Sequence, residues 1–270
     1  MALRRPGCGH GGAVTRSSVS SRSYSRGKER CEMSEKQDFE RAWLDKFSSC
    51  LDEIVGGEIR QEVMTGSEGL SSHSSRQEVI DWSKGAMERL DSLVGEEKSR
   101  EIMTGCACQY PKSDVQEMKK KYEATKDIDL VHQMLQEQFE SFLKHSLGLS
   151  DELVEEIVKR GWGSAGVRKG NAIIATKIPK SGYLLEYMVE TDAEIKRQYY
   201  CHCPRVRDVL KTSQVISPTY CYCGAGFYKG IWEEILQKPV EVEVLETVLK
   251  GDEVCKIAIY LPSDCEHSEL

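Results

Sequence analysis

The stretch "PVEVEVLETVLKGDEVCKIAIYLP" (239–262) decides the fold class. Its apolar residues alternate with polar ones on both sides of a central "KGD" segment. Alternation with a period of two is typical of a half-buried strand, and a glycine-containing turn between two such runs predicts a β-hairpin. The alternating apolar positions are Val240, Val242, Val244, Val254, Ile257 and Ile259.

The segment before this hairpin, "GAGFYKGIWEEILQK" (224–238), has helical periodicity. Short helices are also expected in "DAEIKRQYY" (192–200) and "PRVRDVLKT" (204–212). Further upstream, "NAIIATKIPKSGYLLEYMVE" (171–190) contains two strand-like runs around "KSG", and we interpret it as a second hairpin. Residues 162–262 are therefore expected to be a mixed domain with antiparallel strands and packed helices.

Residues 34–161 show helical patterns almost throughout. The first expected helix opens at Ser34, which has Gln37 three residues later, a capping-box spacing. Two segments, "RQEVMTGSEG" (60–69) and "SREIMTGCAC" (99–108), resemble each other, and each follows a helical run. We interpret them as a duplicated helical unit. The sequence thus predicts an α+β fold with a helical N-terminal half.

The two ends of the chain are expected to lie outside these domains. Residues 1–33 are rich in Arg, Ser and Gly and poor in large apolar residues, so we predict a disordered extension. An organellar transit peptide is one alternative for this stretch. The alternative that we prefer is that Met33 is the physiological start. Residues 263–270 read as a polar tail.

Composition excludes some classes of function. The formal net charge is −7, whereas general nucleic-acid binding usually needs a basic surface. No apolar run is long enough for a transmembrane helix, and no secretory signal is present. We therefore expect a cytoplasmic protein without nucleic-acid or membrane partners.

The chain has 11 cysteines, and six of them form three Cys-x-Cys units. Residues i and i+2 of a strand lie at the edge of disulfide reach, so we do not expect a disulfide within any of the three pairs. Thiolates instead bind soft and borderline metals, and two on one short segment lower the entropic cost of chelation. The expected ligands of zinc or of an iron–sulfur cluster are Cys201, Cys203, Cys221 and Cys223, with Cys106 and Cys108 as contributors or as a second site.

Other roles for the cysteines stay open. They could be redox-active thiols or inert core residues, because free cysteine is commonly buried. Cys221 or Cys223, near a helix N-terminus, could have a lowered pKa and act as a nucleophile. His202 should point away from its flanking cysteines on extended backbone. Cys50 and Cys255 lie in apolar runs and are expected in the core.

Two resemblances follow from these residues. The terminal hairpin, with Gly251, Asp252 and Cys255, is similar to the end of 4-vinyl-reductase-type domains and of aminothiazoline-carboxylate hydrolase-like domains. The run that includes "GWGSAG", "ATKIPKSGY", "CHCPRVRD" and "YCYCGAGFYKGIWEEIL" resembles an uncharacterised family of prokaryotic, often anaerobic, proteins. This similarity covers most of residues 34–262, and the Cys-x-Cys stretches are specific to it. These resemblances imply a cytoplasmic α+β domain that binds a small-molecule ligand.

Together, these observations predict a metal- or iron–sulfur-binding protein with a small-molecule-binding domain, acting as a sensor or accessory protein. The alternative is a cysteine- or metal-dependent hydrolase of a small sulfur-containing heterocycle or amide. A thiol redox protein is a third reading. The sequence does not decide whether the protein is an enzyme, nor its oligomeric state.

Overall fold

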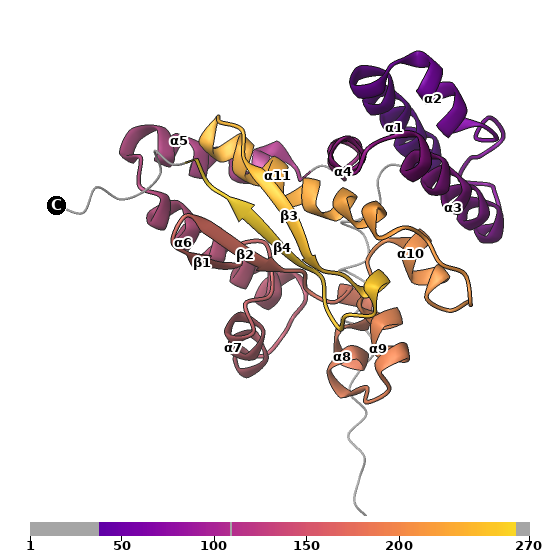
Figure 1. Ribbon diagram of the computed structural model, residues 1–270. Helices are drawn as coiled ribbons and strands as arrows, with labels where there is room; N and C mark the ends of the chain where they lie inside the picture. The colour runs from indigo at the N-terminus through magenta and orange to yellow at the C-terminus, as the bar shows by residue number, and fades with distance from the viewer. Residues whose placement is uncertain (1–37, 109, 263–270) are drawn as a thin grey trace, which may run out of the picture. The chain divides into compact units, whose positions relative to one another are not determined.

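The computed structural model describes residues 38–108 and 110–262, and they have the expected α+β architecture (Figure 1). They belong to one compact unit, residues 37–270. The expected extension (1–33) and tail (263–270) fall outside the described residues. The expected division between residues 161 and 162 stays a prediction. No helix in the described part of the chain is long and apolar enough to cross a membrane.

The N-terminal half is helical, as predicted. Several helices begin at a side chain that accepts a hydrogen bond from the first turn, which satisfies backbone N–H groups that have no partner within the helix. Ser75 and Glu78 form a complete capping box, and Asp38 caps the first helix, whereas the expected cap Ser34 lies outside the described residues. The helices are α1 Phe39–Val55, α2 Gly57–Met64, α3 Arg76–Leu93, α4 Glu96–Gly105, α5 Gln116–Thr125, α6 Ile128–Ser141 and α7 Asp151–Lys159.

The first four helices repeat one pattern. A long helix, α1 or α3, is followed after a break of one or two residues by a shorter one, α2 or α4. This matches the duplicated unit inferred from the sequence. The second copy ends directly before Cys106, which is the C-cap residue of α4.

Four antiparallel strands form one sheet in the order β1-β2-β4-β3. The predicted terminal hairpin is confirmed: β3 and β4 pair with Val244 opposite Ile257. The inner strand β2 pairs with β4 through Ile173 and Ile259, both fully buried. The strands are β1 Val167–Lys169, β2 Ala172–Thr176, β3 Glu241–Glu246 and β4 Lys256–Tyr260.

The other predicted hairpin is wrong in its second half. The turn lies at Gly170 and Asn171, between β1 and β2, rather than at "KSG". Gly170 has a φ of 58°, which suits the tight two-residue turn of a hairpin. The apolar run after Pro179 forms helix α8 instead of a strand. The helices that follow β2 are α8 Leu184–Val189, α9 Ala193–Tyr200 and α10 Pro204–Val209.

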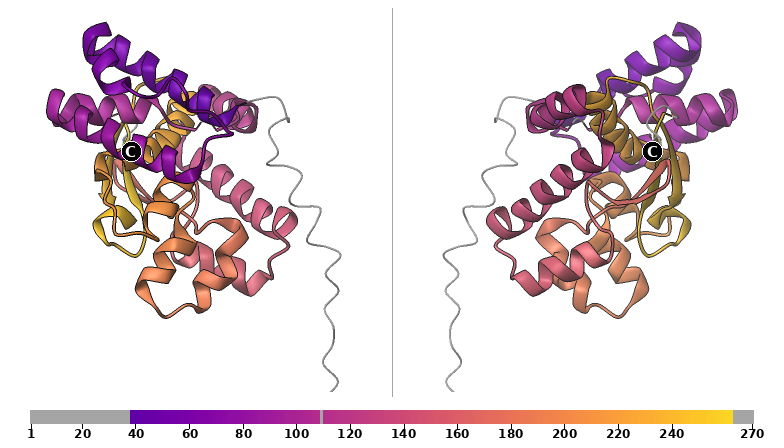
Figure 2. Two further views of the ribbon diagram at one scale, coloured as in Figure 1. Left: turned by 90° about the vertical axis from the view of Figure 1, so that its right-hand side faces the viewer. Right: turned by 90° about the vertical axis from the view of Figure 1, so that its left-hand side faces the viewer.

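Helix α11, Tyr222–Leu236, is the central element of the packing. It packs on β3 and β4 and also against α4 and α5. The side views show α11 between the N-terminal helices and the strands (Figure 2). Trp232 on this helix is fully buried. The close approach of α11 to α4 is set by Gly226, whose missing side chain leaves room for the carbonyl oxygen of Thr104.

The contact at Gly226 leads to a prediction. Gly226→Ala would place a Cβ against the Thr104 carbonyl and 2.7 Å from the Cβ of Ala107, so α11 must move. We expect a loss of about 1–3 kcal/mol in the free energy of unfolding, measured by urea denaturation. Gly230→Ala on the same helix is the matched control, because a Cβ there has no neighbour within 4 Å. It should stabilise the protein by about 0.5–1 kcal/mol; equal effects of the two variants would contradict this account.

Candidate functional site

The structure places the three Cys-x-Cys segments at helix ends, namely the C-terminal end of α4 and the N-terminal ends of α10 and α11, and side-chain contacts connect them. The Sγ atom of Cys223 donates to the carbonyl oxygen of Cys106 over 3.6 Å, which connects the third segment with the first. Cys203 Sγ lies 3.9 Å from the hydroxyl of Tyr220, which connects the second segment with the third. All the cysteines of the described residues are free.

Helix ends position the middle pair. Cys201 is the C-cap of α9 and Cys203 is the N-cap of α10, and both have extended backbone. Pro204 enforces this break because the residue before a proline is disfavoured in helical conformation. His202 is exposed and its Nε2 lies 2.6 Å from the carbonyl oxygen of Ile178, which agrees with the expectation that it points away from the pair.

The two cysteines of the third Cys-x-Cys unit have different neighbours. Cys221 and Cys223 lie at the start of α11, where residues i and i+2 project to different sides of a helix. The Sγ of Cys221 accepts a hydrogen bond of 2.8 Å from Thr247 Oγ1, whereas Cys223 hydrogen-bonds to Cys108. The two sulfurs therefore belong to different groups.

Two cysteines that the sequence analysis placed in the core join these groups. Cys255 Sγ donates to Thr247 Oγ1 over 3.9 Å, so one hydroxyl connects it with Cys221. Cys50 Sγ hydrogen-bonds to Cys106 and lies so close to Gly105 that a Cβ there would be 2.7 Å from it. Both are half-buried and pack against the hydrophobic core, so they lie at its edge. We call Cys201, Cys203, Cys221 and Cys255 the inner thiols, and Cys50, Cys106, Cys108 and Cys223 the outer thiols.

Lys177 is a charged residue of the site that the sequence analysis missed. Its backbone N–H donates to the carbonyl oxygen of Cys255 over 3.0 Å, and its Nζ lies 3.4 Å from the position that a Cβ on Gly224 would take. Burial acts to lower the pKa of Lys177, but Cys255, Tyr228, Cys201 and Cys221 in their anionic forms raise it overall. Nothing in its sequence context, "ATKIPK", signals this role.

As long as no metal ion is bound, the surroundings of the inner thiols favour their protonated, neutral form. Burial raises the pKa of Cys201, and it raises that of Cys221 to about 12. Among the outer thiols, the pKa of Cys223 is raised as well, first by its hydrogen bond to Cys108 and then by burial. The expectation of a lowered pKa at the N-terminus of α11 is therefore wrong, because these effects outweigh the helix dipole. This weakens the nucleophile reading for Cys221 and Cys223.

The outer side is different. The hydrogen bond from Cys223, together with Lys177 and Lys46, lowers the pKa of the exposed Cys108 to about 6. The hydrogen bond with Cys106 lowers the pKa of Cys50 to about 7. Cys50 and Cys108 also line an open groove of about 1200 Å³, whose walls come from α1, α4, α11 and β3. Cys50 and Cys108 are therefore the accessible cysteines of the site, whereas Cys106 is buried and burial raises its pKa.

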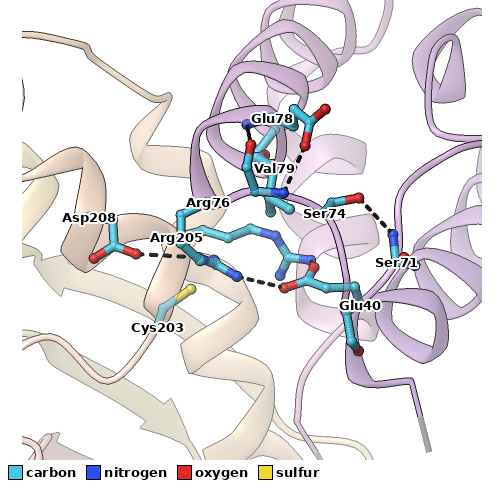
Figure 3. Close-up of polar contacts among 12 residues, drawn as sticks. Glu40, Ser71, Ser74, Arg76, Glu78, Val79, Cys203, Arg205 and Asp208 are labelled. Carbon is cyan, nitrogen blue, oxygen red and sulfur yellow. Dashed lines mark hydrogen bonds and ion pairs between the residues drawn. The ribbon is translucent and has the colours of Figure 1, made fainter.

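A buried ion pair connects the site with the N-terminal helices (Figure 3). The Arg205 guanidinium binds the carboxylate of Glu40, and both side chains are nearly inaccessible, at 2% and 6% exposed. Arg205 also stacks over Trp43, at 4.2 Å from the ring centre, and donates to the Tyr220 hydroxyl over 3.2 Å. Arg76 contacts the same carboxylate from the half-exposed side. This network ties α1 to α10 directly beside Cys203.

One buried polar group of the site lacks a partner within the described residues, and the thiols are not arranged around a metal position. The buried Nε of Arg205 has no hydrogen-bond acceptor there. As they stand, no three His, Cys, Asp or Glu side chains in the described ranges could hold a metal ion together. A tetrathiolate metal ion holds its sulfurs about 3.8 Å apart. Binding a metal here would therefore require the thiols to turn from their present hydrogen-bond partners.

Comparison with known proteins adds a family without an assigned function. Residues 182–265 match a family of unknown function, DUF6144. The matched stretch contains the inner thiols and Cys223, so the expected resemblance to an uncharacterised family is supported for this part of the chain. No curated protein and no solved structure matches. The comparisons therefore give no support for the 4-vinyl-reductase-type and hydrolase-like resemblances or for a prokaryotic origin.

Proposed function

We propose that the protein binds a thiolate-ligated metal centre and that the inner thiols are its ligands. The observation that carries the proposal is the Lys177 ammonium group, which has sulfur neighbours but no ion pair with a carboxylate in the described part of the chain. Lys177 is half-buried, and a charge that is partly removed from water is stabilised when a charge of opposite sign lies near it. A complex of four thiolates with a divalent metal ion or an iron–sulfur cluster keeps a net negative charge, which Lys177 would balance.

An iron–sulfur cluster fits the inner thiols better than a single zinc ion. One zinc ion gathers its four sulfurs at contact distance, whereas a cluster of several irons takes thiolates spread around its outside. Among the inner thiols, Cys221 and Cys255 share the Thr247 hydroxyl, and no sulfur–sulfur hydrogen bond is found among the four in the described part of the chain. The Tyr200 hydroxyl accepts from the Cys255 backbone N–H and donates to the Lys177 carbonyl oxygen.

The free Nε of Arg205 supports the same proposal. A buried N–H without an acceptor costs about 1–3 kcal/mol, and an anionic complex beside Cys203 would offset this cost. The groove next to the outer thiols gives small molecules a route to this region. It therefore agrees with the sensor or accessory role expected from the sequence.

Purification under anaerobic conditions, followed by iron, sulfide and zinc analysis, tests the proposal. We expect iron and acid-labile sulfide with broad visible absorption, and we expect Cys221→Ser to lose both. Cys265→Ser, which removes a thiol of the C-terminal stretch, is the matched control and should keep them. Stoichiometric zinc in a colourless protein would show that the inner thiols bind a zinc ion and not a cluster. A metal-free protein whose inner thiols are all alkylated in the native state would overturn the proposal.

A further inference from the structure

The edge of the sheet at β3 has no partner strand in the described part of the chain (Figure 1). β3 pairs only with β4, and the backbone groups on its other side form no hydrogen bond with another described residue. Side chains of α11 occupy the start of this edge, since Glu233 and Lys229 hydrogen-bond to the backbone of Val240. A register irregularity directly after Val244 ends the regular pairing. The stretch open to a further strand is therefore 241–244.

The same edge borders the groove of about 1200 Å³, and this groove is acidic. Glu241 and Glu243 line it together with parts of α1, α4 and α11. The lining contains eight glutamates against four lysines or arginines, so its formal charge is −4. All four basic side chains already have partners: three bind glutamates, and Lys46 donates to the Ala107 carbonyl oxygen. By contrast, Glu241 and Glu243 are exposed, and neither forms an ion pair with a described residue.

The side chains along this edge alternate between charged and apolar. Glu241 and Glu243 project to one face of the sheet, whereas the half-buried Val242 projects to the other. Aromatic rings line the groove as well, and Tyr110 and Phe227 pack edge to face with ring centres 5.5 Å apart. An added strand would therefore have every second side chain beside glutamates and the others beside apolar groups. Lysine or arginine alternating with an apolar residue matches this pattern.

A second copy of the chain is a poorer match for this edge than a basic segment. Its own β3 would bring the same glutamates to the edge, and like charges on neighbouring strands destabilise their pairing. Its β1 forms the opposite edge of the sheet, but this strand has only three residues. Arg168 of β1 already binds Asp129, which leaves Lys169 to face the glutamates. The charges on both edges thus oppose self-association.

We propose that the β3 edge is a docking site for an extended, basic segment of a partner protein. The segment alternates lysine or arginine with apolar residues and adds to β3 as a further strand along 241–244. Backbone pairing supplies affinity, and the alternating side chains supply specificity. Because glutamates provide part of the attraction, the affinity falls with rising salt concentration. None of the inner thiols lines the groove, so the inference does not depend on the proposed metal centre.

Two peptides of equal charge test the strand geometry. A fluorescein-labelled peptide of four Lys-Val repeats is titrated with the full-length protein and followed by fluorescence anisotropy. A peptide of four Lys-Pro repeats is the control, because proline lacks the N–H group that a strand ladder needs. We expect the control peptide to bind at least about 10-fold more weakly. Hydrogen–deuterium exchange of the complex with the Lys-Val peptide should be slowed at residues 240–247.

Charge reversal tests the recognition. Glu241→Lys/Glu243→Lys should weaken binding of the Lys-Val peptide by about 10-fold, because attractive cross-strand contacts become repulsive. Both side chains are exposed, so the variant should fold, and far-ultraviolet circular dichroism checks this. Glu123→Lys/Glu155→Lys is the matched control: it changes the net charge equally at exposed positions outside the groove and should bind the peptide as the wild type does.

Several outcomes would overturn the proposal. One is a Lys-Val peptide that does not bind, and another is equal binding of the Lys-Val and Lys-Pro peptides, which would show attraction by charge without strand pairing. Equal affinities of the two double variants would show that the glutamates of β3 play no part. If sedimentation velocity shows a dimer of the protein alone, and this dimer protects residues 240–247 from exchange, the edge belongs to a second copy instead.

Discussion

Glu40→Gln is expected to lower the free energy of unfolding by about 3–5 kcal/mol. The substitution keeps the shape of the side chain but removes the anionic partner of Arg205, which is 2% exposed and cannot recover its hydration. Breaking one side of a buried pair leaves an uncompensated buried charge, and that charge is the source of the loss. Urea denaturation monitored by tryptophan fluorescence measures the effect, since Trp43 stacks on the same guanidinium.

Two further variants separate the contribution of the buried charge from that of its surroundings. Arg76→Ala removes the half-exposed partner of Glu40 and should cost less than about 1 kcal/mol. The double variant Glu40→Leu/Arg205→Met removes both charges, so it should be more stable than Glu40→Gln. If the double variant is instead the least stable of the three, the packing of Arg205 matters more than its charge.

Lys177→Met is expected to weaken metal retention by roughly 100-fold. Removing a unit charge at about 5 Å from an anionic complex costs on the order of 3 kcal/mol at an effective dielectric constant of about 20. In the metal-free protein the effect should have the opposite sign, because an ammonium group without a carboxylate partner is replaced by an apolar side chain. Competition with a chelator measures the first quantity, and denaturation of the metal-free protein measures the second.

The opposite signs make this prediction specific. Lys169→Met on strand β1 is the matched control, because Lys169 is exposed and lies outside the site, and it should change neither quantity. A Lys177→Met protein that retains metal as tightly as the wild type would contradict the charge-balancing role. A loss of stability in the metal-free state would show that the ammonium group has a structural partner.

Local patterns were sufficient for much of the fold. The alternation from Val240 to Ile259 identified the terminal hairpin, and the repeat around "MTG" identified a duplicated helical unit. The structure shows that each copy of this unit is a pair of helices. The error after Pro179 arose because a short apolar run fits a strand and a helix equally well. In that case tertiary packing decides, and Tyr187 on α8 packs against Trp162 and Tyr200.

The site was less accessible to sequence reasoning because its contacts are not local. The Cys-x-Cys spacing identified six of the eight thiols that gather in the described residues. It could not show that α11 directs Cys221 and Cys223 to different partners. Cys50 and Cys255 stand alone in apolar runs, and a single cysteine in such a run has the appearance of a core residue. Lys177 and the Glu40–Arg205 pair have no spacing signal, since their partners lie far away in the chain.

The thiols come from segments that extend from α1 to the residue directly before β4. A chain in which α1 has not docked, or in which the terminal hairpin has not paired, lacks at least one member of a set. If the protein binds the proposed metal centre, incorporation would therefore come late in biosynthesis, after the tertiary structure is assembled, rather than acting as a nucleus for folding. Cells that lacked the metal would accumulate a folded precursor that is ready for loading, instead of an unfolded chain destined for proteolysis.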